Sequence, residues 1–100
     1  MIDLNRQLKI LMRTGKFSIG TSEAIESARS GRAKIILLSS NCPEPERSDI
    51  SQYAKISEVP LHVCDTSGVD LAAACGKPYP VSAISVYEPG DSEILQLVKA

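Results

Sequence analysis

The feature that most constrains the fold is an uninterrupted aliphatic run, Ile-Ile-Leu-Leu, at residues 35–38. Such a run without polar alternation is typical of a strand whose two faces are both covered, and we expect it within a strand over residues 33–39. Because helices on both faces of a sheet are the mark of layered α/β proteins, this run predicts the central strand of one. The chain has 100 residues, 43% of them hydrophobic, which predicts one domain over residues 1–100 with a core of modest size.

Helical and extended segments alternate along the chain. Apolar periodicity and glycine or proline stops predict helices over residues 3–13, 22–30, 45–56, 67–75 and 91–98. Short apolar segments predict strands over residues 16–19, 33–39, 60–64 and 81–87. Asp3 is the predicted N-cap of the first helix, and Ser67 opens a capping box with Asp70. This alternation predicts a three-layer α/β/α sandwich with a four-stranded mixed sheet.

Charge is divided unevenly along the chain. The net charge of −1 argues against a protein that coats nucleic acid through bulk positive charge. Residues 1–34 contain seven Lys or Arg against three Asp or Glu, whereas residues 35–100 contain four against nine. A chain of this kind can present one cationic face to a polyanion, although a solvated charge pattern without a partner explains the division equally well.

The cysteines and the N-terminal residues bear on compartment. Cys42, Cys64 and Cys75 cannot all pair within the chain, and their spacing matches no common zinc or redox motif. We therefore expect reduced thiols in the cytoplasm, with no metal and no other cofactor. The charged N-terminal segment and a longest apolar run of five residues, 71–75, argue against a signal peptide and a membrane span.

The sequence contains no convincing catalytic constellation. Gly15-Lys16 lacks the other residues of a phosphate-binding loop. His62 and Cys64 alternate along one strand as a base and a thiol nucleophile would, but no third residue orients them. We therefore expect a protein that is not an enzyme, with a small thiol enzyme as the least favoured alternative.

Candidate binding residues gather in three segments, two of which lie at predicted helix starts. These segments are the glycine turn at residues 20–23, the loop that contains Asn41, and the proline-rich loop at residues 77–80. Backbone N–H groups at helix starts favour phosphate or carbonyl oxygens, whereas Glu23 favours a donor edge such as the N1–H and N2–H of guanine. That edge is accessible in RNA where the base leaves the ordinary duplex.

The same residues have an interpretation without a ligand. Thr21 and Ser22 are good helix caps, Glu23 complements the helix dipole, and Asn41 is able to cap the next helix. Both interpretations stay open on spacing alone.

Several short motifs occur together in one order. They include Thr14-Gly15-Lys16, Ile19-Gly20, Ser40-Asn41-Cys42-Pro43, Tyr53-Ala54-Lys55, Gly76-Lys77-Pro78, Val81-Ser82-Ala83 and Pro89-Gly90-Asp91-Ser92. Over nearly its whole length the chain resembles the archaeal and eukaryotic large-subunit ribosomal proteins of the thirty-e type, which belong to the kink-turn RNA-binding superfamily.

The resemblance implies a ribonucleoprotein component of translation. The expected function is that of a structural constituent of the large subunit, located in the cytoplasmic ribosome, which binds and stabilises a kink-turn or similar internal loop in ribosomal RNA. The implied partners are this RNA and neighbouring ribosomal proteins, with no membrane and a monomer outside the ribosome. The alternative is a protein-interaction module of the same superfamily that acts through its acidic surface.

The resemblance also implies an RNA-binding set in the three segments. Its members are Gly20, Thr21, Ser22, Glu23, Asn41, Lys77, Pro78, Tyr79, Pro80 and Val81. Glu23 would accept hydrogen bonds from guanines in sheared G·A pairs, and Asn41 would meet a base edge or a ribose. Lys77 would contact phosphate, while Tyr79, Pro80 and Val81 would shelter an extruded base.

The chain departs from the resembled family just after the glycine turn. Ser22, Glu23 and Glu26 stand where that family usually places a lysine or arginine. We therefore expect weaker RNA binding with a lower salt dependence.

Overall fold

The computed structural model describes residues 4–42, 44–64, 66–88, 90–92 and 94. The elements in chain order are α1 (Leu4–Thr14), β1 (Lys16–Ile19), α2 (Thr21–Ser30), β2 (Ile35–Leu38), α3 (Glu46–Ile56), β3 (Leu61–Val63), α4 (Gly68–Cys75) and β4 (Ala83–Glu88). The predicted helices and strands between residues 4 and 88 are thus confirmed, with ends that differ by a few residues. Most of the predicted closing helix, residues 91–98, lies outside the described residues, and so does Asp3.

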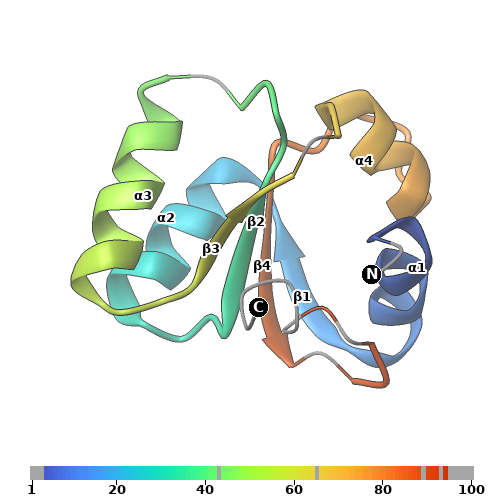
Figure 1. Ribbon diagram of the computed structural model, residues 1–100, viewed down its shortest axis with the longest axis horizontal. Coiled ribbons are helices and arrows are strands. Elements are labelled where there is room, and N and C mark those ends of the chain that lie inside the picture. The colour runs from blue at the N-terminus through green and yellow to red at the C-terminus, as the bar shows by residue number, and fades with distance from the viewer. Residues whose placement is uncertain (1–3, 43, 65, 89, 93, 95–100) are drawn as a thin grey trace.

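The strands form one mixed sheet in the order β1-β4-β2-β3. Strand β4 is antiparallel to both β1 and β2, and β2 is parallel to β3. Helices α2 and α3 lie on one face of this sheet, and α1 and α4 lie on the other (Figure 1). The predicted three-layer sandwich with a four-stranded mixed sheet is therefore confirmed.

The side chains of β2 explain why both faces must be covered. Ile35 and Leu37 pack in the cluster beneath α1 and α4, whereas Ile36 and Leu38 pack in the cluster beneath α2 and α3. Each of these side chains is at most 1% exposed. Since burying an Ile or Leu side chain stabilises a fold by roughly 1.5–3 kcal/mol, this strand binds the two helical layers to one sheet.

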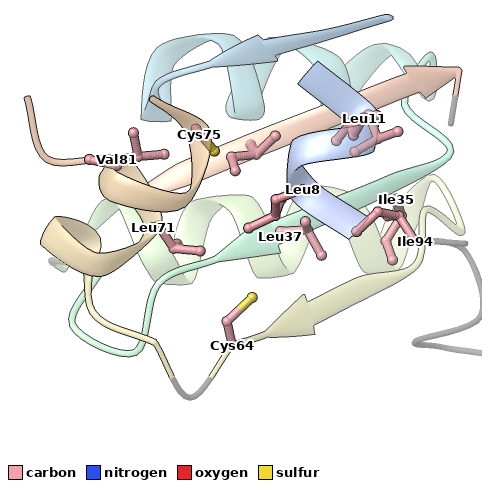
Figure 2. Close-up of a cluster of buried hydrophobic side chains, with 12 residues drawn as sticks. Leu8, Leu11, Ile35, Leu37, Cys64, Leu71, Cys75, Val81 and Ile94 are labelled. Carbon is pink, nitrogen blue, oxygen red and sulfur yellow. The ribbon is translucent and has the colours of Figure 1, made fainter. Parts of the chain in front are cut away.

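The cluster beneath α1 and α4 is seen in Figure 2. Leu8 and Leu11 of α1 and Leu71 of α4 belong to one cluster with Leu37, Leu8 lies beside Leu37 in the view, and each of the four is fully buried. Ile94 is also fully buried in this cluster. The other apolar residues of the predicted closing helix lie outside the described part of the chain.

Local signals end and begin the helices where the sequence indicated. Gly31 and Gly76 both follow a helix with φ 72°, the left-handed conformation that favours glycine. At the start of α4 the Ser67 hydroxyl accepts a hydrogen bond from the Asp70 N–H at 3.3 Å. The predicted cap at Ser67 is therefore confirmed.

Candidate functional site

The three predicted segments meet at one end of the sheet, where β1 and β2 end and β4 begins. The Gly20 N–H donates to the Ala83 carbonyl at 3.0 Å, and the Ser39 N–H donates to the Ser82 carbonyl at 2.9 Å. Because β4 lies between β1 and β2, the start of β4 connects the glycine turn on one side with the Asn41 loop on the other. We call this arrangement, comprising residues 20–23, 39–42, 66–68 and 77–82, the loop edge.

Asn41 is held in place by the start of α4. Its Oδ1 accepts a hydrogen bond from the Gly68 N–H at 3.0 Å, and the Gly68 carbonyl accepts one from the Val81 N–H at 2.9 Å. A Cβ at position 68 would lie 3.2 Å from the Val81 carbonyl oxygen, so a glycine suits this close approach. These two hydrogen bonds, through Gly68, connect the Asn41 loop with the end of the proline-rich loop at Val81.

The bond to Gly68 also decides which end of the Asn41 amide faces outward. Since only the oxygen can accept from an N–H, the NH₂ group of this exposed side chain is left as a donor, and no described residue binds it. The alternative in which Asn41 caps the next helix is wrong, because α3 follows Pro45 without a side-chain cap.

The glycine turn presents unshielded backbone donors. Gly20 is the N-cap of α2 with φ 128° and ψ 153°, a conformation that is essentially restricted to glycine, and no side chain caps the helix. The alternative in which Thr21 and Ser22 cap α2 is therefore wrong. The first-turn N–H groups carry partial positive charge and suit an oxygen ligand, while Ser22 and Glu23 are exposed beside them.

The proline-rich loop forms one side of an apolar pocket against α4. The pocket has a volume of about 260 Å³ and is lined by Val69, Ala72, Ala73, Lys77, Pro78, Tyr79 and Pro80. The Tyr79 side chain is 50% exposed, so its ring face is available to a ligand. Val81 is not in the pocket: it is fully buried in the cluster beneath α1 and α4 and supports the loop from below.

The three thiols lie in the core. Cys42, Cys64 and Cys75 form no disulfide and are buried, and only 1% of Cys64 is exposed, so it offers no nucleophile to a substrate. Burial raises the pKa of Cys42 and of Cys75 above the ordinary value of 9.0, with Arg47 and Lys77 respectively opposing the shift. Both thiols are therefore neutral at physiological pH.

Among the described residues there is no group of three or more His, Cys, Asp or Glu side chains that could hold a metal ion. No helix in the described ranges has the length and apolar character needed to cross a bilayer.

Comparison with known proteins identifies relatives over nearly the whole chain. A profile of the family described as Ribosomal protein L7Ae/L30e/S12e/Gadd45 matches residues 2–96. The large ribosomal subunit protein eL30 of Methanothrix thermoacetophila is 46% identical over 99 residues, which cover 99% of this chain and 92% of that protein. The eL30 proteins of Methanococcus vannielii and Lupinus luteus are each 38% identical, over 96% and 93% of this chain and 91% and 83% of their own lengths.

A solved structure supports the fold. A Bacillus halodurans protein described as of unknown function has a TM-score of 0.81 with this chain, 18% identity, and coverage of 98% of this chain and 97% of its own. At that identity the likeness supports the fold alone. The resemblance predicted from the motifs is confirmed by the family match and the eL30 relatives, and since these relatives are ribosomal proteins, so is the prediction that the chain is not an enzyme.

Proposed function

Because the chain belongs to the ribosomal protein L7Ae/L30e/S12e/Gadd45 family, we propose that it is a structural constituent of the large subunit of the cytoplasmic ribosome. The eL30 relatives described above carry that role in their names. The finer part of the proposal is that the loop edge binds a kink-turn or similar internal loop of ribosomal RNA. Outside the ribosome the protein is a monomer, and inside it neighbouring ribosomal proteins complete its contacts.

The observation that carries the RNA proposal is the convergence of complementary groups at the loop edge. The uncapped amides that follow Gly20 and the outward NH₂ of Asn41 are donors for phosphate, ribose or base oxygens. Glu23 is an exposed acceptor beside them and matches the N1–H and N2–H of a guanine outside ordinary pairing. The set therefore fits a folded RNA better than it fits a regular duplex.

The apolar pocket supports the same ligand. A base that has left its stack can rest on the exposed ring of Tyr79 and the neighbouring Pro80, with Lys77 near its phosphate. Val81 then acts by fixing the loop through its buried side chain and its bond to Gly68.

Recognition by shape follows from the rigidity of these supports. The loop edge is joined by backbone hydrogen bonds to β4 and by the bond between Asn41 and Gly68. A site of fixed geometry binds the bent form of an RNA better than the extended form, and it shifts the RNA toward the bent form by that difference in affinity.

The direct test is a titration with two RNAs. The purified protein is mixed with a kink-turn RNA and with the same duplex from which the bulge has been deleted, and the dissociation constants are compared. Tighter binding of the kink-turn is expected, whereas equal affinities would refute shape recognition.

Removal of the Glu23 carboxylate tests the proposed guanine contact. Glu23→Ala is expected to weaken kink-turn binding by about 1–3 kcal/mol, the usual cost of a lost base contact. Glu58→Ala is the matched control, because Glu58 is an exposed carboxylate in the connection that precedes β3, at the end of the sheet opposite Gly20. Equal effects of the two changes would show that Glu23 does not meet a base.

A further inference from the structure

The two helical layers differ in charge. Helices α1 and α4 together carry three cations and one carboxylate, whereas α2 and α3 carry three cations and four carboxylates. Exposed Glu44 and Glu58 flank α3 and add to the negative side. The α1–α4 layer is therefore the more favourable one for a polyanion.

The cations of α1 form one stripe. Arg6, Lys9 and Arg13 are spaced at i, i+3 and i+7 and so fall within about 60° of one another around a helix of 3.6 residues per turn. All three are exposed, while Leu8 and Leu11 bury the opposite side of the helix. We call these three residues the basic stripe.

Two members of the basic stripe have no carboxylate partner among the described residues. Within the described ranges, neither Lys9 nor Arg13 makes an ion pair, whereas Arg29 pairs with Glu26 at 2.6 Å. Arg6 lines a polar pocket that also contains Asp91, which leaves Lys9 and Arg13 as the members of the stripe without a described acidic neighbour. Exposed, unpaired cations one turn apart are suited to phosphate groups rather than to a neutral surface.

The position of α1 connects this stripe with the loop edge. Helix α4 borders the pocket of Tyr79, and α1 packs beside α4 in the same layer (Figure 1). The exposed residues of α4, Val69 and Ala73 among them, include a single carboxylate, Asp70. A helical arm that leaves the loop edge on this side would pass over α4 and reach α1, and Asp70 is the one exposed carboxylate that the described residues of α4 place on that path.

We propose that a duplex arm of the bound RNA runs along the α1–α4 layer and that its phosphates contact the basic stripe at Lys9 and Arg13. The proposal rests on the proposed function for the place at which the RNA is anchored. A duplex carries about one negative charge per 1.7 Å of its axis, so the roughly 6 Å between Lys9 and Arg13 along α1 faces about three or four charges. The stripe thus supplies cations that the glycine turn lacks at Ser22 and Glu23.

The test compares two double variants that remove the same charge. Lys9→Gln with Arg13→Gln removes two cations from α1, and Arg47→Gln with Lys55→Gln removes two exposed cations from α3 in the opposite layer. Dissociation constants are measured over a series of salt concentrations with a kink-turn RNA whose arms are long and with one whose arms are cut short. Thermal unfolding of each variant shows that it is folded.

The α1 variant is expected to flatten the plot of log affinity against log salt for the long-armed RNA by about 0.9 for each lost phosphate contact. The α3 variant should follow the wild type, and the short-armed RNA should respond little to either change. Equal slopes for the α1 and α3 variants with the long-armed RNA would overturn the proposal.

Failure of the proposed function has a different signature. If the wild type binds the kink-turn and the bulge-deleted duplex equally well, shape recognition at the loop edge is wrong. A loss of salt dependence confined to the α1 variant would, in that case, still assign duplex contact to the basic stripe, while its absence would remove both proposals.

Discussion

At the scale of single residues, Asn41 has two separable tasks. Its Oδ1 accepts the hydrogen bond from the Gly68 N–H and so serves the fold, whereas its NH₂ has no partner among the described residues and can serve a ligand. Gly68 is buried, so loss of this acceptor leaves a backbone N–H without a partner. The two tasks can be distinguished because aspartate keeps the acceptor and loses the donor.

We therefore predict different results for two substitutions. Asn41→Ala should lower the free energy of unfolding by about 1–3 kcal/mol, the cost of an unsatisfied buried group, and should also weaken RNA binding. Asn41→Asp should retain most of the stability and still weaken RNA binding, because the NH₂ donor is replaced by a negative oxygen. Urea denaturation and RNA titration measure the two effects, and wild-type RNA affinity for Asn41→Asp would contradict a contact through the amide nitrogen.

The buried thiols give a second prediction at this scale. Burial raises the pKa of Cys42 and Cys75 in the folded protein above 9.0, the value expected when the chain is unfolded. At pH values between 9.0 and the raised pKa of the folded state, the folded protein holds more protons than the unfolded chain. The free energy of unfolding therefore falls as pH rises above 9.0. Below 9.0 both states hold the proton and the contribution is constant.

This dependence is measured by urea denaturation at pH values on both sides of 9.0. The double variant Cys42→Ala, Cys75→Ala should be less stable at neutral pH because two core side chains are shortened. Its stability should nevertheless fall less steeply at high pH than that of the wild type. Parallel pH profiles for the two proteins would show that the thiols do not contribute.

At the scale of the elements, α2 has a glycine at each end for different reasons. Gly20 precedes the helix with φ 128° and Gly31 follows it with φ 72°. A Cβ at Gly20 would meet no other atom within 4 Å, and one at Gly31 would meet Ser57 at an ordinary 3.8 Å. Substitution at either position therefore costs backbone strain rather than a steric clash.

Gly20→Ala and Gly31→Ala are consequently a matched pair. Each should lower the free energy of unfolding by roughly 1–3 kcal/mol. Only Gly20→Ala should also weaken RNA binding, because it alone moves the amides at the start of α2. Loss of affinity in proportion to stability in both variants would mean that the glycine turn has no direct part in binding.

These elements also show how far sequence reasoning extends. Periodic apolar residues and glycine stops were sufficient to predict α2 and α4, because helix periodicity and capping depend on neighbours a few positions away. The same local reasoning was wrong about Asn41, whose partner Gly68 lies 27 positions along the chain. The resemblance, for its part, implied that Val81 shelters an extruded base, whereas its side chain is fully buried in the cluster beneath α1 and α4.

The candidate site was accessible to prediction for a related reason. Helix starts that follow strands of the same direction lie at the same end of a sheet, and β1 and β2 share a direction because each is antiparallel to β4 between them. The alternation of strands and helices in the sequence therefore favoured a site where the glycine turn and the Asn41 loop come together. The direction of the Asn41 amide and the pocket beside Tyr79 depend on contacts between distant segments, and pattern alone does not contain them.

At the scale of the whole molecule, the sheet separates two apolar clusters that share β2. Leu37 belongs to the cluster beneath α1 and α4, and Ile36 belongs to the cluster beneath α2 and α3. Both side chains are fully buried. Because these two residues are adjacent on β2, separation of β2 from one helical layer also disturbs the cluster on its other face.

We therefore predict that Leu37→Ala and Ile36→Ala each lower the free energy of unfolding by about 2–5 kcal/mol and leave a single cooperative transition. Two probes report on the two sides: labelling of the Cys75 thiol reports on the first cluster, and the near-ultraviolet dichroism of Tyr53 and Tyr87 reports on the second. Their midpoints in urea should coincide in the wild type and in both variants. Separate midpoints would show that one helical layer unfolds while the other stays folded, in which case the shared strand does not couple the loop edge to the rest of the molecule.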